Sequence, residues 1–311
     1  MLKYDRNGMQ LLESRIYDIV DAVHVANVPK DASRLDLWMP CITSNEHQRL
    51  LDVKVETSLP VKVTYDPAFG NKILYLEGKG PGITEAEVKL RYKVLKREYR
   101  VNVDPNIVGR FNDTDLQLLQ KYLRSEKYVP VDDRIRKLAL EIVGREDNII
   151  EQVKRIFDHV VGHMRYNALE QSSVGSAEHA LACSTGNCND IHALFMSLCR
   201  SINIPSRLVM GYELVENIEG CEICGYHCWA EFFAPNLGWV PIDASCSTKY
   251  GKHGLFGSLE ANHIALSKGR DIVLSPPQKG EPILFFYSAY AEVDGSKHTD
   301  TKRSFTFKAI D

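Results

Sequence analysis

The chain has 311 residues, of which 44% are hydrophobic and 25% are charged, and its formal net charge is −3. This composition is typical of a globular protein, and the length predicts two domains rather than one. With a pI of about 6.4, the charge gives no indication of a nucleic-acid partner. No run of 18 or more apolar residues occurs, which excludes a membrane-spanning helix in this sequence, and we expect no membrane partner.

The first residues and the cysteines indicate the compartment. Residues 1–13 carry charges throughout and lack an apolar stretch, so we expect no signal peptide in the sequence as it stands. Eight cysteines are too few for a disulfide scaffold in a chain of this length, and most of them fall between Cys183 and Cys246. That clustering favours a reducing compartment. We therefore expect a cytoplasmic protein, with a periplasmic or secreted form as the alternative.

The first third of the chain has the pattern of many short strands. Apolar and polar residues alternate along four runs: Leu35, Leu37 and Met39; Leu51, Val53 and Val55; Val61, Val63 and Tyr65; and Val88, Leu90, Tyr92 and Val94. Turn-forming residues separate these runs at short intervals. Strands with one polar and one apolar face predict an antiparallel β-sandwich over residues 1–105. Because it holds no cluster of titratable residues, we interpret it as an accessory or binding domain.

The pattern changes after residue 105. Apolar residues at helical spacing predict three helices, beginning near residues 113, 135 and 149, with a helix-start signal at 113–115. Strands are predicted again at 207–214, 227–233, 239–243, 272–274 and 282–287. Helices followed by strands indicate an α+β domain over residues 106–311.

Cys188 is the first candidate for chemistry. Gly186 and Asn187 form a tight turn before an apolar helical stripe that begins at Ile191, which places Cys188 in the first turn of a helix. The positive end of a helix dipole lowers the pKa of a thiol and favours the thiolate, which is the attacking species. The free N–H groups there can also hold an oxyanion. We therefore predict that Cys188 is a nucleophile.

His227 and Asp243 lie on two β-prone runs joined by a short Pro, Asn and Gly turn, which predicts a hairpin. A five-residue loop at 233–237 places Asp243 directly opposite His227, whereas a four-residue loop at 235–238 places it opposite Ala230. In the first register the carboxylate can orient the imidazole toward a thiol. The catalytic triad therefore depends on a register near the first one.

Three blocks in this order resemble the bacterial transglutaminase-like superfamily, whose catalytic domain is papain-like. They are Gly-Asn-Cys-Asn-Asp at 186–190, His-Cys-Trp-Ala-Glu at 227–231, and Gly-Trp-Val-Pro-Ile-Asp at 238–243. The resemblance implies acyl transfer from peptide or amide bonds by a thiol, without metal or cofactor, on a peptide or protein substrate. It also implies an upstream oxyanion donor, for which Tyr166 is the candidate, and it allows an N-terminal β-sandwich. Cys228 departs from the family pattern, where a small residue such as alanine is more usual.

Several alternatives remain open at this point. Hydrolysis by a cysteine peptidase or amidase is expected first, and transamidation by a transglutaminase second, because the residues do not decide whether water or an amine attacks the thioester. A structural zinc clip could use thiolates of Cys221, Cys224 and Cys228 with Cys183 or Cys246. A non-catalytic binding module is the remaining rival. Four glutamates at 213–222 either favour cationic substrates or form a solvated face.

Overall fold

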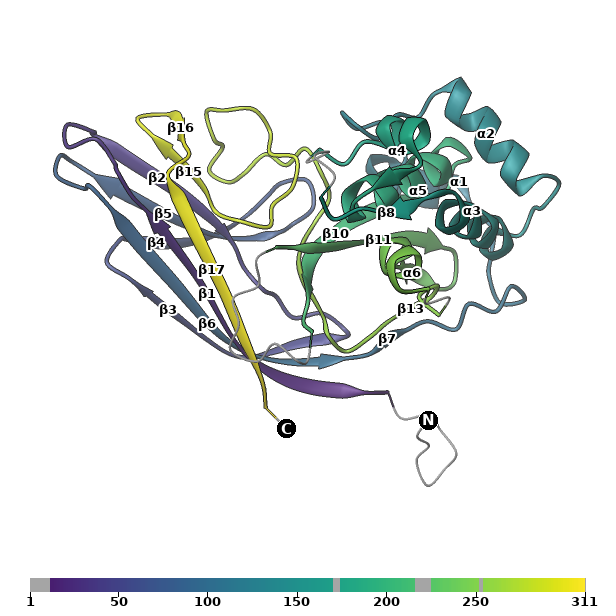
Figure 1. Cartoon of the computed structure of the whole chain (residues 1–311), viewed down its shortest axis with the longest axis horizontal. Helices are drawn as coiled ribbons and strands as arrows, with labels where there is room; N and C mark the ends of the chain where they lie inside the picture. The colour runs from purple at the N-terminus through teal and green to yellow at the C-terminus, as the bar shows by residue number, and fades with distance from the viewer. Residues whose placement is uncertain (1–11, 170–173, 216–224, 252–253, 311) are drawn as a thin grey trace. The chain divides into compact units, whose positions relative to one another are not determined.

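The computed structural model describes residues 12–169, 174–215, 225–251 and 254–310. The fold is α+β, with mostly antiparallel strands and, in the described residues, six α-helices (Figure 1). The chain divides into two compact units. Unit 1 comprises Met1–Glu98, Met210–Tyr226 and Glu260–Asp311, and unit 2 comprises Tyr99–Val209 and His227–Leu259.

Unit 1 contains the two antiparallel sheets of the predicted β-sandwich. One sheet has the order β17-β1-β6-β3, formed by β17 (Thr301–Ile310), β1 (Ser14–Val25), β6 (Ala86–Arg97) and β3 (Gln48–Thr57). The other has the order β16-β15-β2-β5-β4, formed by β16 (Ser296–His298), β15 (Tyr290–Val293), β2 (Arg34–Pro40), β5 (Lys72–Lys79) and β4 (Val61–Tyr65). Side chains from both sheets share one buried apolar cluster, which β14 (His263–Lys268) joins. The alternation in the sequence follows from this packing.

Met210–Tyr226 and the C-terminal part of the chain belong to unit 1, so the two units do not follow the predicted division into residues 1–105 and 106–311. Strand β17 pairs with β1 from Ile16↔Ile310 to Val25↔Thr301, and β15 pairs with β2 (Figure 1). The strands expected at 272–274 and 282–287 form only one isolated bridge. Prolines at 276, 277 and 282 lack the N–H donors that a longer ladder would need. Pairing between distant segments leaves no local signal in the sequence.

A buried ion pair ties β17 to β1. Asp21 lies in the inward-facing row of β1 and is fully buried. Arg303 on β17 donates two hydrogen bonds to its carboxylate, one from Nε to Oδ1 at 2.7 Å and one from Nη2 to Oδ2. Burial raises the pKa of Asp21, and the Arg303 charge opposes that effect. Neither charge is tolerated in an apolar core without the other.

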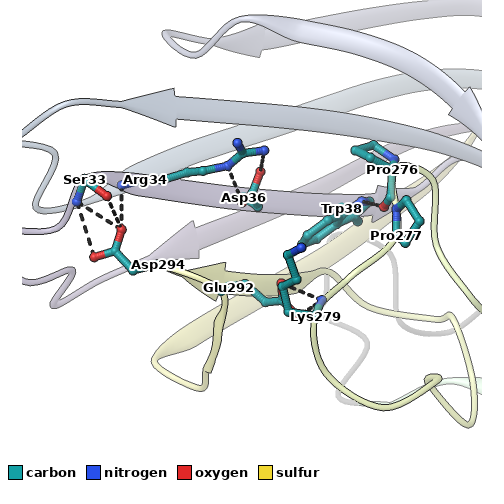
Figure 2. A pocket seen from close by; sticks show the side chains of 10 residues that line it. Ser33, Arg34, Asp36, Trp38, Pro276, Pro277, Lys279, Glu292 and Asp294 are labelled. Atoms are coloured by element: carbon teal, nitrogen blue, oxygen red, sulfur yellow. Dashed lines mark hydrogen bonds and ion pairs between the residues drawn. The ribbon is translucent and has the colours of Figure 1, made fainter.

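A hollow of about 510 Å³ in unit 1 is lined by β2, β15 and the loop at 276–279 (Figure 2). The carboxylates that line it accept hydrogen bonds from neighbouring backbone and side-chain groups. Glu292 accepts the N–H groups of Lys279 and Gly280, and Asp294 accepts the N–H and the hydroxyl of Ser33. Asp36 is bound by Arg34 through two hydrogen bonds (Figure 2). Glu292 and Asp294 therefore fasten loop residues to the sheet, whereas Asp36 is paired within β2.

Two of the alternating runs do not face the core. A sandwich normally turns the apolar faces of its strands inward, yet most apolar residues of β3 and β4 are between 39% and 57% exposed, and Leu50 of β3 is the one that packs against the core. The exposed residues are Leu51, Val53, Val55, Val61, Val63 and Tyr65. β3 and β4 are the terminal strands of their sheets, and the opposite sheet does not bury their apolar side chains. The alternation of apolar and polar residues predicts a strand, but the position of that strand in its sheet decides whether its apolar face is buried.

Unit 2 is built around helix α5 (Cys188–Ser201), all of whose residues are buried. The other helices are α1 (Asp113–Leu118), α2 (Asp133–Val143), α3 (Ile149–His163), α4 (Ala177–Cys183) and α6 (Ala244–Tyr250), with a 3-10 turn at Gln120–Tyr122. Its strands are β7 (Tyr99–Arg100), β8 (Arg165–Tyr166), β9 (Thr185–Gly186), β11 (His227–Ala234), β12 (Gly238–Ile242) and β13 (Ser258–Leu259), with β10 (Ser206–Glu213) continuing into unit 1. Helices α2, α3, α4 and α6 and strand β11 pack on α5.

The three predicted helices in this region correspond to α1, α2 and α3. Each begins at an asparagine or aspartate whose side chain accepts a helix N–H, at Asn112, Asp132 and Asn148. Within the described residues, none of the helices has both the length and the apolar character required to span a bilayer.

We expect Asp21→Asn to lower the free energy of unfolding by about 3–5 kcal/mol, because it leaves the Arg303 charge buried without its counter-ion. Urea denaturation followed by circular dichroism measures the change. Asp18→Asn is the matched control, since Asp18 is an exposed aspartate on the same strand. Replacing both partners by Asp21→Leu and Arg303→Met should cost less than Asp21→Asn alone. Equal effects of Asp21→Asn and Asp18→Asn would contradict the assigned role of the pair.

Candidate active site

The turn before α5 places Cys188 at the first position of the helix. The Asn187 side chain accepts the N–H groups of Asn189 and Asp190, and the Asp190 carboxylate accepts the N–H of Asn187, which completes a capping box. A Cβ at Gly186 would lie 2.7 Å from the Cβ of Asp190, so only glycine fits this approach. Cys188 itself is only 5% exposed. The predicted helix-start cysteine is confirmed.

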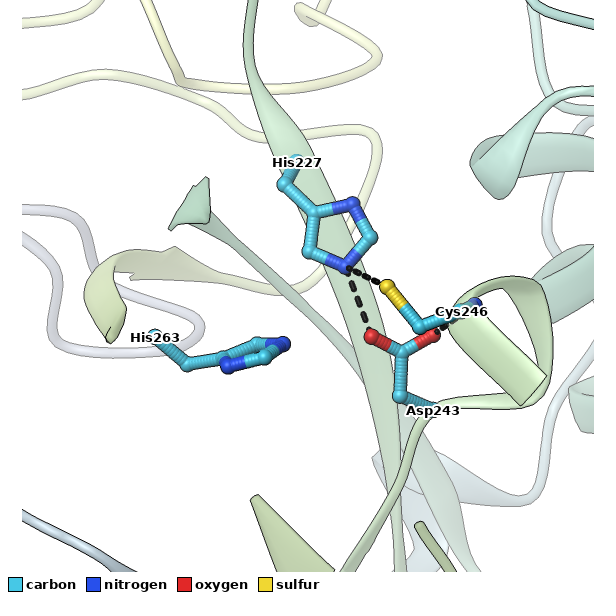
Figure 3. A group of neighbouring side chains, drawn as sticks. All are labelled: His227, Asp243, Cys246 and His263. Atoms are coloured by element: carbon cyan, nitrogen blue, oxygen red, sulfur yellow. Dashed lines mark hydrogen bonds and ion pairs between the residues drawn. The ribbon is translucent and has the colours of Figure 1, made fainter. Parts of the chain in front are cut away.

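The imidazole of His227, the first residue of β11, is held by the carboxylate of Asp243. Nε2 lies 2.7 Å from Oδ2 of this fully buried aspartate, and Figure 3 shows the carboxylate directed at the ring. The other oxygen, Oδ1, accepts the N–H of Cys246 at 2.8 Å and the hydroxyl of Ser245 at 2.9 Å. With Nε2 engaged by Asp243, Nδ1 is the ring nitrogen left for the thiol.

The hairpin register matches neither of the two predicted ones. The ladder runs from Ala230↔Ile242 to Ala234↔Gly238, which leaves a three-residue connection at 235–237. Asp243 then leaves the strand: it is the N-cap of α6, and its own N–H bonds the carbonyl of Leu255. A helix cap brings the carboxylate to the ring, whereas the sequence had suggested a cross-strand pair.

The electrostatics favour a thiolate beside an imidazolium. The pKa of Cys188 is lowered to about 5, first by a hydrogen bond with Cys228 and then, against the effect of burial, by the hydrogen bond and charge of His227. Burial acts to lower the pKa of His227, but the Asp243 charge and the hydrogen bonds that the ring makes with Asp243 and Cys188 hold it well above its ordinary value. Burial instead raises the pKa of Cys199, farther along α5. Cys188 is therefore the activated thiol of its helix.

A second histidine lies behind this pair. His192 is completely buried, and its Nε2 accepts the backbone N–H of Ala244 at 3.2 Å. Burial lowers the pKa of His192 to about 4, so the ring is neutral and its proton is on Nδ1, which lies 3.7 Å from Sγ of Cys228. The Cys228 thiol in turn lies 3.1 Å from Oδ1 of Asn189, and its single S–H can be donated either there or to the Cys188 thiolate. This network links the start of α6 to Asn189, the residue that follows Cys188.

Sequence reasoning missed His192 and took Cys228 for a departure from the family pattern. One signal was available, because His192 follows Cys188 by four positions and so lies on the same face of α5. For Cys228 no local signal exists. Its contacts with Asn189 and Cys188 depend on how β11 packs against α5.

Tyr166 is also brought to this region. β8 pairs in parallel with β9, so Tyr166 lies opposite Gly186, two residues before Cys188, and the N–H of Asn167 bonds the Gly186 carbonyl at 2.9 Å. The pKa of Tyr166 is raised to about 12, first by burial and then by the charge of Cys188. Its phenol therefore stays protonated at neutral pH and can donate a hydrogen bond.

The zinc clip can be traced only in part, because Cys221 and Cys224 lie outside the described residues. Cys183 is exposed near His179, and Cys246 instead lies 3.6 Å from Nε2 of His227. Together with Asp243, that pair offers sulfur, nitrogen and oxygen atoms within 4.8 Å of one another. A metal bound there would compete for the nitrogen that the Asp243 carboxylate holds.

Sequence comparison with known proteins matches the part of the chain that contains Cys188, His227 and Asp243. The family model described as the transglutaminase-like superfamily matches residues 136–244. An uncharacterized protein from Haemophilus influenzae is 26% identical over 91% of this chain and 85% of its own length. Uncharacterized protein YebA from Bacillus subtilis is 24% identical over 40% of this chain, and the match spans 19% of YebA.

Among solved structures, a protein from Cytophaga hutchinsonii that is provisionally described as a cysteine protease superposes with a TM-score of 0.66 at 17% sequence identity. The superposition covers 97% of this chain and 93% of that protein, and at this identity it establishes a shared fold. The three sequence blocks lie within the range that the family model matches. Residues 136–244 therefore form a domain of the transglutaminase-like superfamily.

Proposed function

We propose that the chain is an enzyme that transfers acyl groups from peptide or amide bonds through a thioester on Cys188. His227 carries the proton, Asp243 orients His227, and the substrate is a peptide or protein. The observation that carries this proposal is the 2.7 Å bond from Asp243 to a ring that also hydrogen-bonds the thiol. The transglutaminase-like domain at 136–244 supports the same class of chemistry.

In the first half-reaction, the Cys188 thiolate attacks the carbonyl carbon and the carbonyl electron pair moves to the oxygen. The Asn187 side chain occupies the N–H groups of Asn189 and Asp190. The N–H of Cys188 is therefore the helix-start donor left for the oxyanion, and the Tyr166 phenol is the second donor. As the C–N bond breaks, the His227 imidazolium gives its proton to the leaving nitrogen.

In the second half-reaction, water attacks the thioester and His227, now neutral, accepts its proton. The C–S bond breaks, the Cys188 thiolate leaves, and the ion pair is restored together with a free carboxylic acid. We propose hydrolysis, as in a cysteine peptidase or amidase, because water needs no second binding site. Attack by an amine in place of water would make the chain a transamidase. Incorporation of a labelled primary amine into a glutamine peptide would reveal that outcome.

We expect Cys188 to react with iodoacetamide at pH 6 far faster than the other seven cysteines, because its hydrogen bonds with Cys228 and His227 lower its pKa to about 5 and so populate the thiolate. Peptide mapping by mass spectrometry measures the rates. Cys188→Ala should abolish peptide hydrolysis, and His227→Ala should lower kcat by at least about 10³-fold, whereas Cys199→Ala should retain activity. Similar slow labelling of all eight thiols would refute the enzymatic proposal and leave a binding module.

The ion pair also predicts the pH profile of kcat/KM. The thiolate is lost as the pH falls through the lowered pKa of Cys188, about 5, and the imidazolium is lost as the pH rises through the raised pKa of His227. Activity should therefore form a plateau that extends above the ordinary histidine pKa. Asp243→Asn removes the charge that raises the pKa of His227, so the alkaline limb should move to lower pH. An unmoved alkaline limb in Asp243→Asn would contradict this assignment.

Cys228 supplies the largest effect that lowers the pKa of Cys188. Cys228→Ala should therefore move the acid limb of the profile, and of alkylation of Cys188, to higher pH. Cys228→Ser keeps a hydrogen-bond donor and should restore most of the shift. Cys199→Ala is the matched control, since it removes a buried thiol without contact to Cys188. An acid limb that stays in place in Cys228→Ala would show that this contact is only packing.

A further inference from the structure

The β-sandwich of unit 1 is open along the edge that β3 and β4 form. Each of these strands ends its sheet, and only residues 58–60 connect them, so they lie on the same edge. Val53 and Val55 of β3 pair with core residues of β6. Val61 and Val63 of β4 pair in the same way with core residues of β5. Opposite residues of a ladder share a face, so these four valines point to the core side, yet they are 39% to 52% exposed.

Strand β3 also has an open backbone edge. It pairs with β6 on one side, and no strand in the described part of the chain pairs with its other side. The strand is 10 residues long, whereas proteins that block pairing at an edge commonly use short edge strands. Every residue from Leu51 to Glu56 is exposed. An exposed edge strand with an apolar face can accept a further strand into its sheet.

The charges on the outward face of β3 indicate which strand fits there. Asp52, Lys54 and Glu56 alternate with the apolar residues. When two copies of β3 pair antiparallel about a two-fold axis through a residue, apolar residues lie opposite apolar residues. An axis at Lys54 would place like charges opposite each other, which is unfavourable. An axis at Val55 places Lys54 of each copy opposite Glu56 of the other, so the strand is complementary to itself.

The bulge in β3 separates this register from the remaining one. An axis at Val53 would also join opposite charges, because Asp52 would lie opposite Lys54. It would need Leu51, however, which the irregularity between Leu50 and Asp52 leaves out of the ladder. The register about Val55 uses only the regular part of the strand.

The contacts of Lys54 within one chain favour the same arrangement. Lys54 lies directly opposite Arg91 of β6, and like charges at such a position are destabilising. The Nε atom of Arg91 donates to Oε1 of Glu56 at 2.6 Å, whereas Lys54 makes no ion pair with another described residue. Glu56 of a second copy would place a carboxylate beside the Lys54 ammonium.

We propose that the β3 edge is the interface of a two-fold homodimer, in which β3 pairs antiparallel with β3 of a second copy about Val55. Because the two sheets are stacked, the same axis passes through the second sheet and brings β4 toward β4 of the other copy. The exposed apolar rows of both strands are then covered. Each copy contributes the same surface, so assembly stops at two chains. The inference is independent of the proposed enzymatic function.

Sedimentation velocity of the full chain over about 1 to 100 μM tests the association. The sedimentation coefficient should rise with concentration from that of one chain to that of two and then stay constant. A monomer at every concentration would overturn the proposal and leave the edge to a strand of a different protein. Assemblies that keep growing beyond two chains would overturn it as well, because a two-fold interface is closed.

Val55→Lys tests whether this edge forms the interface. It places two ammonium groups next to each other in the apolar row, so the Kd of the dimer should rise at least about tenfold. Leu140→Lys is the matched control, since it adds the same charge at an exposed apolar residue of α2 and should leave the Kd unchanged. Thermal unfolding followed by circular dichroism checks that both variants fold. An unchanged Kd in Val55→Lys would overturn the proposal.

A charge exchange tests the register. Lys54→Glu sets a carboxylate opposite Glu56 in both halves of the interface and should weaken the dimer. Adding Glu56→Lys to that variant reverses both signs and should restore most of the affinity. Lys137→Glu makes the same charge change as Lys54→Glu on the exposed face of α2 and should have no effect. If the double variant stays as weak as Lys54→Glu alone, the assigned pairing of Lys54 with Glu56 is wrong.

Cross-linking locates the axis directly. Residues opposite each other in an antiparallel ladder have Cα atoms about 4.5 to 5.5 Å apart, which a disulfide can span. Val55→Cys treated with the thiol oxidant diamide should therefore give a reducible covalent dimer on a denaturing gel. The unsubstituted chain and Val53→Cys should not, because Val53 lies opposite Thr57 in this register. A dimer that Val53→Cys links and Val55→Cys does not would overturn the assigned axis.

Discussion

The orientation of the His227 imidazole by the buried Asp243 carboxylate is the interaction on which the proposed chemistry depends. Asp243 performs two tasks: Oδ2 bonds Nε2 of the ring, while Oδ1 caps α6 through the N–H of Cys246. Because the cap restrains the carboxylate, the ring has one orientation and Nδ1 remains for Cys188. Loss of this aspartate would release the ring and also weaken the start of α6.

A second set of contacts around Cys188 also affects its position and its pKa. The N–H of Ala244 fixes the tautomer of His192, whose Nδ1 faces Cys228, and Cys228 lies against both Asn189 and the nucleophile. The same short segment, Asp243 and Ala244, therefore positions the base directly and the nucleophile indirectly. Coupling of this kind explains why a thiol that is almost completely buried can still have a lowered pKa, whereas burial raises the pKa of Cys199.

The β-sandwich of unit 1 shows which features the local sequence pattern predicts and which depend on how the strands are arranged in the sheets. Alternation identified strands correctly at β2, β3, β4 and β6, because the two-residue period follows from the pleat of a single strand. It did not reveal that residues 260–311 return to pair with β1 and β2, nor that β3 and β4 end their sheets with apolar faces exposed. Those features depend on which strands become neighbours, and strands distant in sequence leave no periodic trace.

The sequence by itself determined the α+β class and the helix start at Cys188, which follows from short-range chemistry, namely the glycine turn and the capping residues of α5. His227 and Asp243 were expected from the hairpin pattern, and Tyr166 from the family resemblance alone. Only the tertiary structure decided the hairpin register, the contact of Asp243 as a helix cap, and the roles of His192 and Cys228. These depend on the distances between packed elements, which no spacing along the chain encodes.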